Sequence, residues 1–526
     1  MTSFPPPVMN LGRLLSDTAR AWPGRIGLVR GEEVWRWQEI DGAVNALVAG
    51  LCSLGLAKGQ RILIASRNRP EMFFAMWAVF KLGAVAVPVN PRLTPPEMAY
   101  LAAHSGAVAI LHDSGFEPHV AAMRAAAPAI GRVLGFDGDY PALVAAHRGA
   151  PAWEEEVGYG DPLWFFYTSG TTGRPKAGVL THGQMAFVTT NHLADLMPGL
   201  TVEDASLVVA PLSHGAGVHM LSQVARGAKS VLPVQDRLDP AEVWALVERW
   251  RVSNMFTVPT IVKMLVEHPA VDRHDHSSLR HLIYAGAPMY RADQKLALAK
   301  LGRVLVQYFG LGEVTGNITV LPAYLHREDD AAPDARIGTC GLPRTGMEIG
   351  ILDPEGRRLP PFETGEICCR GPAVFAGYHD NPEATAKALK GGWFHTGDLG
   401  HVDAEGFVYI TGRASDMYIS GGSNIYPREC EEILLAHPAV SEVAVLGVPD
   451  AKWGEVGVAV VVLRAGQTAD EAALLAHLDG RLARYKWPRR FFFWEALPKS
   501  GYGKITKQMV REELYARGEI ARQESA

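Results

Sequence analysis

The run Tyr167-Thr-Ser-Gly-Thr-Thr-Gly-Arg-Pro-Lys176 predicts a phosphate-binding loop between two strands. Apolar residues precede it at 163–167 and follow it at 178–181, so the polar segment is a short loop that connects two extended runs. Its glycines let backbone N–H groups approach an anion, its hydroxyls can donate to phosphate oxygens, and its lysine adds a positive charge. The run is not a Walker A loop, because Pro175 stands where that motif needs its second glycine. A surface loop has the same composition, so other motifs must decide between the two interpretations.

Six more motifs follow the loop in a fixed order. They are Pro211-Leu-Ser-His214, Tyr284-Ala-Gly-Ala-Pro288, Tyr308-Phe-Gly-Leu-Gly-Glu313, Gly392-Trp-Phe-His-Thr-Gly-Asp398, Gly412-Arg413 and Pro498-Lys-Ser-Gly-Tyr-Gly-Lys504. Together with the loop they resemble the adenylate-forming superfamily, in its acyl-CoA synthetase branch of fatty-acid and aryl-acid CoA ligases. The resemblance covers nearly the whole chain, and several motifs in order are more specific than one. It implies that a carboxylate attacks the α-phosphate of ATP, and that the thiol of CoA then displaces AMP from the acyl-adenylate.

The composition is typical of a cytoplasmic enzyme that acts on small molecules. A net charge of -5 and a pI of about 6.4 give no basic excess for nucleic acid. Five cysteines without a CxxC pair indicate a reducing compartment, and the first residues lack the pattern of a secretory signal. The most apolar stretch, 73–89, contains Lys81 and is too short for a membrane span. The expected partners are a carboxylic acid, ATP and CoA, and a homodimer is compatible with the sequence.

The order of apolar runs predicts an α/β fold with more than one domain, since 526 residues exceed a single core. Strands and helices alternate over 61–112, where Asn68 is expected to cap a helix from Pro70 to Leu82, and again over 230–308. We therefore expect a large N-terminal domain of two doubly wound α/β subdomains plus a small β-rich subdomain, followed by a small mobile α+β lid domain. The expected boundaries are 1–412 for the adenylating domain, 413–416 for the hinge and 417–526 for the lid.

The resemblance assigns the nucleotide site residue by residue. The implied ATP-binding residues are Thr168, Ser169, Gly170, Thr171, Thr172, Gly173, Lys176, Gly286, Ala287, Pro288, Tyr308, Phe309, Gly310, Gly312, Asp398, Ile410 and Arg413. Thr172 and Glu313 are expected to hold Mg²⁺, which prefers oxygen ligands, and Asp398 to accept hydrogen bonds from both ribose hydroxyls.

Two positions depart from the family pattern. Gly312 stands where relatives carry threonine, so either a backbone N–H or Thr315 must replace that hydroxyl. Ser415, followed by Asp416, stands at the pivot of the lid, where Asp or Lys is usual.

The remaining assignments concern catalysis and the two other substrates. The resemblance implies Lys504, Glu313 and His214 as the catalytic set, and Gly421, Gly422 and Trp453 as CoA-binding residues, although Trp453 could equally be a core residue. The implied acyl pocket consists of His214, Gly215, Gly217, Ala285 and Gly316.

The small residues of the implied pocket leave room for more than acetate. We favour a medium- or long-chain fatty acid, followed by an aryl or arylalkenyl acid. An adenylation enzyme that loads a carrier protein and a luciferase-like oxygenase are more remote.

Overall fold

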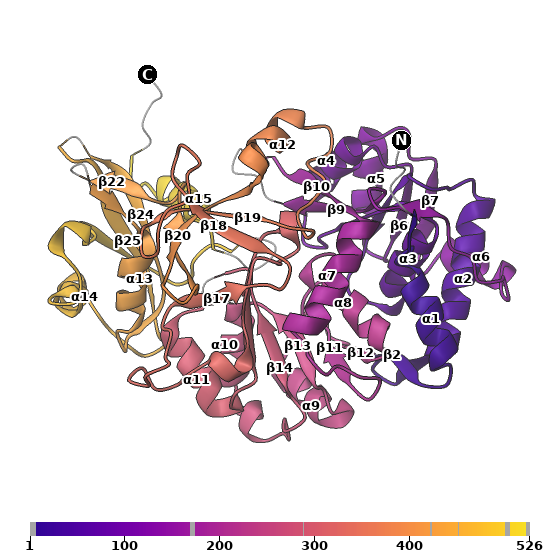
Figure 1. The fold of residues 1–526 in the computed structure, drawn as a ribbon, viewed down its shortest axis with the longest axis horizontal. Helices are drawn as coiled ribbons and strands as arrows, with labels where there is room; N and C mark the ends of the chain where they lie inside the picture. The colour runs from indigo at the N-terminus through magenta and orange to yellow at the C-terminus, as the bar shows by residue number, and fades with distance from the viewer. Residues whose placement is uncertain are drawn as a thin grey trace.

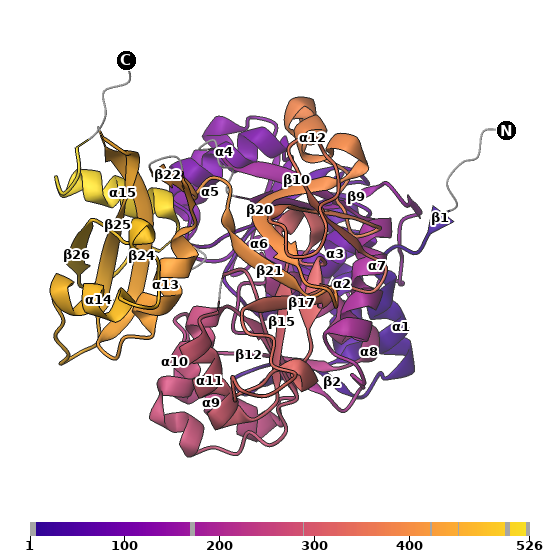
Figure 2. The same ribbon diagram turned by 60° about the vertical axis from the view of Figure 1, so that its left-hand side comes forward.

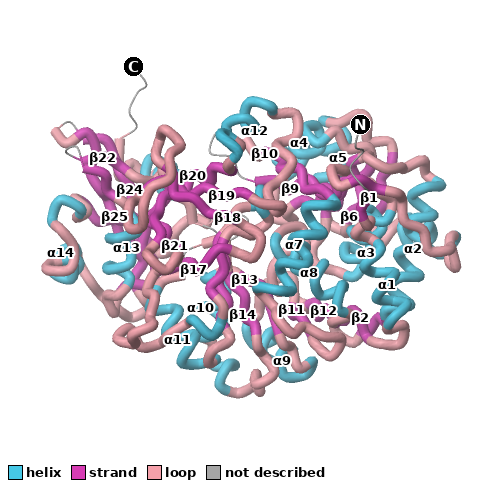
Figure 3. Tube along the Cα trace, in the orientation of Figure 1, coloured by secondary structure: helices cyan, strands magenta, loops and turns pink. Residues whose placement is uncertain are grey.

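A computed structural model describes residues 7–168, 174–287, 289–420, 423–450, 452–499 and 505–521. Figure 1 shows a large N-terminal part and a smaller C-terminal part at its left. Figure 3 shows that helices surround the sheets of the large part. No helix in the described ranges has the length and apolar character that crossing a membrane requires.

The first sheet is doubly wound, as the alternation over 61–112 predicts. Among the described residues it has six strands in the order β10 (Lys176–Thr181), β9 (Pro162–Thr168), β5 (Val85–Val89), β4 (Arg61–Ala65), β6 (Ala109–His112) and β7 (Arg132–Gly135), parallel except for β10. Its helices are α2 (Trp37–Ser53), α3 (Pro70–Lys81), α4 (Pro95–Ser105), α5 (Glu117–Ala126) and α6 (Asp139–Ala146). Ile62 and Ile64 of β4 join one hydrophobic core, and Leu63 and Ala65 join the core on the opposite face.

The second sheet continues from parallel into antiparallel strands. Its described strands run in the order β18 (Glu348–Leu352), β19 (Gly365–Arg370), β20 (Phe394–Val402), β21 (Val408–Arg413), β17 (Thr339–Pro343), β16 (Thr319–Leu321), β15 (Leu305–Phe309), β14 (His281–Tyr284), β13 (Asn254–Thr257), β11 (Ala205–Leu207), β12 (Lys229–Leu232), β2 (Ile26–Arg30) and β3 (Glu33–Arg36). The strands from β15 to β2 are parallel. The antiparallel end, from β16 to β18, contains the predicted β-rich subdomain.

Helices cover both faces of the parallel strands. The helices associated with the second sheet are α9 (Pro240–Trp250), α10 (Pro259–Glu267), α11 (Arg291–Leu301), α7 (His182–Asp195), α8 (Gly215–Arg226) and α1 (Arg13–Ala21). Helix α12 (Pro382–Ala388) lies near β20. A two-stranded sheet of β1 (Pro7–Val8) and β8 (Val157–Gly158) is separate. Helix α3 is buried on nearly all sides, as expected of a helix that is apolar all round.

The C-terminal part is the predicted α+β unit. It contains β22 (Tyr418–Ser420), β23 (Ser423–Ile425), α13 (Pro427–Leu435), β24 (Val440–Asp450), β25 (Gly454–Leu463), α14 (Glu471–Leu478), β26 (Arg490–Trp494) and α15 (Lys507–Ala516). Figure 2 shows this unit beside α10 and α11. Lys263 Nζ donates to Ser441 O at 3.2 Å, and Arg464 lies 3.5 Å from Glu267, so polar contacts join the two parts.

One local prediction is wrong. The residue that precedes α3 is Arg69 rather than Asn68, and its side chain makes no capping bond. Asn68 instead donates to Ala210 O at 2.8 Å and accepts from Leu212 N at 2.8 Å. Its amide therefore ties the end of β4 to the segment before α8, a long-range role that local pattern does not reveal.

Candidate functional site

A buried carboxylate lies where the two large sheets meet. Glu313 is 5% exposed and follows β15 in a short 3-10 turn. Its Oε1 accepts from Thr168 Oγ1 at 3.1 Å and from Tyr378 Oη at 2.8 Å. The structure thus joins the end of β9 to a residue 145 positions further along the chain.

Lys176 lies near Tyr378, which donates to this carboxylate. It begins β10 directly opposite Thr168, so the two residues form the described ends of the predicted phosphate loop. Its Nζ lies 5.3 Å from the centre of the Tyr378 ring. Ser169, Gly170, Thr171, Thr172 and Gly173 lie outside the described residues. Tyr378 therefore links the carboxylate to the cation, a role that no motif indicated.

This arrangement fits a nucleotide with a divalent cation. A carboxylate oxygen is the kind of ligand that Mg²⁺ prefers, and two hydroxyl donors hold the Glu313 carboxylate in place. The lysine ammonium supplies the positive charge that phosphate oxygens require.

Close packing explains the glycine at 312. A Cβ on Gly312 would lie 2.7 Å from Phe166 Cδ1 and 2.7 Å from Thr168 Cγ2, so a side chain has no room here. The hydroxyl of Thr315 accepts from Asn317 Nδ2 at 3.0 Å. A hydroxyl that accepts one hydrogen bond keeps its proton for donation, so this bond is compatible with either substitute for the missing threonine.

Asp398 and Arg413 meet across neighbouring strands. They are directly opposite in the pairing of β20 with β21, and Arg413 Nε lies 3.0 Å from Asp398 Oδ1. Asp398 is 5% exposed, whereas half of the Arg413 side chain is in solvent. Ile410 O accepts from Arg428 Nη1 of the C-terminal part at 3.1 Å. The predicted ribose residues thus lie at the junction of the two parts.

Three side chains with potential metal-ligand atoms lie beside the part of β20 that leads to Asp398. Glu366, Cys368 and His395 bring three ligand atoms within 4.8 Å of one another, among the described residues. The two oxygens of Glu366 already have partners, since Oε1 accepts from Gly397 N at 2.9 Å and Oε2 lies 2.8 Å from His395 Nδ1. Burial raises the pKa of the Cys368 thiol. These contacts fix the Thr-Gly-Asp segment of β20 in place.

His214 lies beside the nucleotide site. It precedes α8, and its ring stacks on Phe166 with centroids 4.4 Å apart. Phe166 in turn packs against Gly312. One aromatic ring therefore separates His214 from the turn that carries Glu313.

Protein atoms fill the space beside the predicted acyl-pocket glycines. A Cβ on Gly215 would overlap the Phe256 ring, one on Gly316 would overlap Tyr308, and one on Gly217 would overlap Leu212 O. These glycines permit close packing in the described state.

Three stacked rings stand next to these glycines. His219 stacks on Phe256 with centroids 4.5 Å apart and planes 18° apart, and Phe256 stacks on Tyr308 at 5.8 Å and 15°. Ala285 belongs to the hydrophobic cluster that contains Tyr308. The sequence analysis missed His219 and Phe256. Their signal was weak, because one is a helical histidine and the other a strand phenylalanine.

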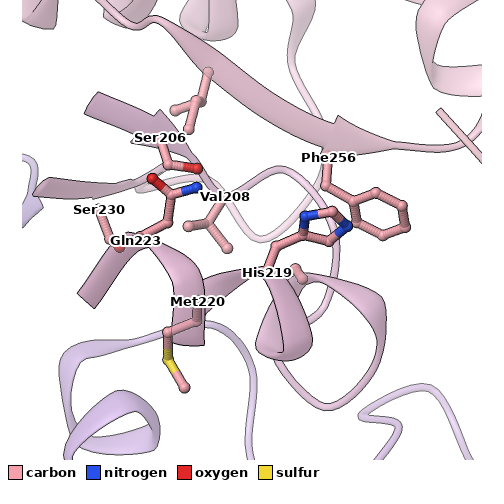
Figure 4. Close-up of a pocket in the computed structure, with 9 residues that line it drawn as sticks. Ser206, Val208, His219, Met220, Gln223, Ser230 and Phe256 are labelled. Carbon is pink, nitrogen blue, oxygen red and sulfur yellow. The ribbon is translucent and has the colours of Figure 1, made fainter. Parts of the chain in front are cut away.

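A small cavity of about 10 Å³ adjoins this stack, between α8 and the strands β11 to β13. Figure 4 shows His219 beside Phe256 at one end of the cavity, and Ser206, Gln223 and Ser230 together at the other. The volume is about that of one water molecule.

The other predicted residues are dispersed or lie outside the described ranges. Pro288, Gly421, Gly422 and Lys504 are not among the described residues. Gly286 is exposed with a φ of 83°, and Ala287 is half-buried.

Phe309 packs against two hydrophobic clusters, and a Cβ on Gly310 would overlap the backbone of Gly316. Trp453 is 41% exposed, so it is not a core residue in this state.

Residues 15–379 match the family described as AMP-binding enzyme, and residues 429–504 match the AMP-binding enzyme C-terminal domain. A feruloyl-CoA synthase from Amycolatopsis sp. is 38% identical over 497 residues, which cover 94% of this chain and 96% of that protein. The long-chain-fatty-acid–CoA ligase FadD13 of Mycobacterium tuberculosis is 33% identical, with 96% and 99% covered.

Two solved structures are also similar to this chain over nearly its whole length. A fatty acyl CoA synthetase from Mycobacterium tuberculosis superposes with a TM-score of 0.75 at 31% identity, and 97% of this chain and 99% of that chain are covered. ATP-bound MatB from Rhodopseudomonas palustris gives a TM-score of 0.86 at 30% identity, with 96% and 98% covered.

Proposed function

Because the chain belongs to the family of AMP-binding enzymes and is an AMP-forming acid–thiol ligase, we propose that it couples an aryl or arylalkenyl acid to CoA. The stack of His219, Phe256 and Tyr308 is the observation that supports an aromatic acid. Flat rings prefer offset or stacked aromatic partners, and the stack borders Gly215 and Gly316, where the acid is expected. A ring of the substrate would take its place beside Phe256, which must turn to admit it.

The fatty acid favoured by the sequence analysis is the alternative. A long alkyl chain would extend past the rings to the inner end of the cavity, where Ser206, Gln223 and Ser230 lie. Ser230 Oγ has no hydrogen-bonding partner among the described residues and a hydrocarbon tail could not supply one, so that end disfavours such a tail. The named relatives include ligases of both classes, and they do not decide between them.

The proposed roles at the nucleotide rest on the family resemblance, and the contacts of Glu313, Lys176 and Asp398 support them. Lys176 and the loop bind the β- and γ-phosphates, and Asp398 accepts from the ribose hydroxyls. Glu313, oriented by Thr168 and Tyr378, holds Mg²⁺. The ion supplies charge neutralisation on the phosphates. His214 borders the reacting carboxylate, and Lys504 stabilises charge that develops at the α-phosphate.

The lid is proposed to begin at the hinge 413–416. β21 ends at Arg413 and β22 begins at Tyr418, so the hinge is the connection between the two parts. The contacts between the two parts combine polar pairs with the packing of Tyr290 against the core of the lid. Relative motion of two domains is expected unless their interface is large and hydrophobic. The lid would bring Lys504 to the carboxylate in the first step, and Trp453 to CoA in the second.

Acid-dependent AMP release, measured with and without CoA, tests this function. Cinnamate and benzoate should give higher kcat/KM than octanoate and palmitate, and the thioester should form only with CoA. Higher kcat/KM for the alkanoates would establish the fatty-acid alternative. Product release without any thioester would contradict CoA ligation.

A further inference from the structure

Three side chains of the types that bind metal ions converge on one face of β19 and β20. Glu366 and Cys368 are two residues apart on β19, and Cys368 lies directly opposite His395 in the antiparallel pairing of the two strands. His395 Nδ1 lies 2.8 Å from Glu366 Oε2 and 3.4 Å from Cys368 Sγ. The pairing of the strands therefore brings a carboxylate, a thiol and an imidazole together, outside the roles proposed for the nucleotide and the acid.

The partners of His395 require a positive charge at Nδ1. His395 Nε2 lies 3.2 Å from the carbonyl oxygen of Lys390, which can only accept, so the hydrogen of a neutral ring is on Nε2. The lone pair of Nδ1 then faces a carboxylate oxygen of Glu366, which is also an acceptor. Two acceptors at 2.8 Å attract each other only through a cation, which is either a second proton on the ring or a metal ion.

The thiol favours the metal ion. A proton would join Nδ1 to the Glu366 oxygen and leave the sulfur beside them without a role. A metal ion would bind all three atoms, which lie within 4.8 Å of one another. The pair of His274 and Glu248, 2.7 Å apart, has no third ligand atom of this kind among the described residues. The cysteine thus distinguishes this cluster from an ordinary ion pair of histidine and glutamate.

The dimensions of the cluster fit Zn²⁺. Metal–ligand bonds of about 2.0 Å to nitrogen and oxygen and about 2.3 Å to sulfur place the ligand atoms of a tetrahedral zinc site about 3.3 to 3.6 Å apart. The distances of 2.8 and 3.4 Å at His395 Nδ1 come close to this range, and small rotations of the side chains would complete the fit. Zinc accepts sulfur, nitrogen and oxygen ligands together, whereas Mg²⁺ prefers an octahedron of oxygens.

The surroundings also match those of a zinc site. Metal-binding histidines usually donate their other ring N–H to an outer acceptor such as a carbonyl, and Lys390 O is placed to accept it. Gly397 N donates to Glu366 Oε1 at 2.9 Å, which orients the carboxylate. The side chains of His395 and Glu366 are 20% and 30% exposed, so an ion can enter together with a water molecule.

We propose that Glu366, Cys368 and His395 bind one Zn²⁺ ion, with a water molecule as the fourth ligand. Cys368 loses its thiol proton as the sulfur–zinc bond forms, and the proton shared by His395 and Glu366 also leaves. Both protons go to the solvent, as is usual when a metal ion takes the place of protons on its ligands.

The ion would fix the segment that carries Asp398. His395 pairs with Cys368 and Leu399 pairs with Glu366, so residues 396–398 of β20 lie opposite the single residue 367 of β19. Such a bulge re-aims a side chain, and here Asp398 is its last residue. Zinc at the base of the bulge should hold it in place and raise the Tm, because a ligand of the folded state stabilises that state.

Cobalt(II) provides the direct test, because it replaces zinc in tetrahedral sites and gives a charge-transfer absorption band when it binds a thiolate. The full-length protein, freed of metal with a chelator, should gain this sulfur-to-cobalt band, and one equivalent of Zn²⁺ should abolish it. Zn²⁺ should also raise the Tm, whereas Mg²⁺ should not displace the cobalt. These measurements need no acid, ATP or CoA, so their outcome is independent of the proposed function.

Cys368→Ala should remove the band and weaken zinc binding by more than roughly 100-fold, since the loss of an outer partner alone costs about 10- to 100-fold. Cys369→Ala is the matched control, because Cys369 is the neighbouring buried cysteine of β19 and packs in a hydrophobic core. It should keep both the band and the affinity. Glu366→Gln retains the shape of the side chain and should weaken binding while the sulfur band remains, which provides a second variant if Cys368→Ala does not fold.

A wild-type chain without the sulfur band would overturn the proposal and leave His395 and Glu366 as an ion pair. A band that persists in Cys368→Ala would also overturn it, because another cysteine would then bind the ion. Zinc affinities equal to that of the wild type in both Cys368→Ala and Glu366→Gln would have the same meaning.

Discussion

Among single residues, Tyr378 has the clearest consequence for the nucleotide site. Its hydroxyl donates to Glu313 Oε1, and its ring lies under Lys176 Nζ. Burial, followed by the nearby charge of Glu313, raises the pKa of this hydroxyl, so it stays protonated and a donor at neutral pH. The residue couples the orientation of the proposed Mg²⁺ ligand to the position of the phosphate-binding lysine.

Tyr378→Phe should keep the ring and lose the hydrogen bond. We expect Mg·ATP to bind roughly 10-fold more weakly, the lower end for a bond to a charged group, as measured by calorimetry. Tyr409→Phe is the control, since it removes a hydroxyl from Asp403, a carboxylate that no motif places in the site. Equal affinities for Tyr378→Phe and wild type would refute the orienting role.

Asp398→Ala should weaken nucleotide binding by about 1.5 to 3 kcal/mol, because two ribose hydroxyls lose a charged acceptor. The buried partner of Arg413 also disappears, so thermal unfolding must be followed in parallel. Unchanged calorimetric affinity for ATP in a folded variant would count against the ribose assignment.

At the level of elements, glycines in helices show where packing is tightest. Gly217→Ala in α8 would force a Cβ onto Leu212 O and to 2.7 Å from Trp164 Cη2. Overpacking of this kind costs about 1 to 3 kcal/mol, so the Tm should fall. Gly42→Ala in α2 is the matched control, with no atom within 4 Å of the added Cβ. It should raise stability through helix propensity, by about 1 kcal/mol at most. A lower Tm for Gly42→Ala than for Gly217→Ala would contradict this packing.

The elements that could be predicted were those with local signals. The Thr-x-x-Glu pattern of Thr94 and Glu97 is a local signal for the capping box at the start of α4, and β9 and β10 flank the phosphate loop as expected. The place of β2 at the far end of the second sheet could not be predicted, because its pairing with β12 joins residues about 200 positions apart. Motifs indicated Glu313, in a short 3-10 turn, and Asp398, in β20. They could not indicate Tyr378 or His219, whose roles arise from contacts between distant segments.

In the whole molecule, the position of Trp453 fits a lid surface that meets a ligand. The ring is exposed, with Lys452 Nζ 5.1 Å and Arg489 Cζ 6.0 Å from its centre. An exposed aromatic beside two cations suits a base with phosphates. Trp453→Ala should raise the KM for CoA about 10-fold if one stacking contact of roughly 1 to 3 kcal/mol is lost. Pyrophosphate release in the first step should change little. A lower Tm without an effect on CoA would contradict the assignment.

Separate measurement of the two half-reactions should distinguish the role of the lid from that of the large domain. If the lid brings Lys504 to the α-phosphate only in the first step, Lys504→Ala should slow adenylate formation by roughly 10²- to 10³-fold, as for the loss of one preorganised donor. Transfer from a supplied acyl-adenylate to CoA should continue, because that step needs the opposite arrangement of the lid. Lys499→Ala is the control, since this lysine of the same segment pairs with Glu442 within the lid. Equal losses in both half-reactions for Lys504→Ala, with the fold intact, would show that the lysine acts through the structure of the lid rather than on the phosphate.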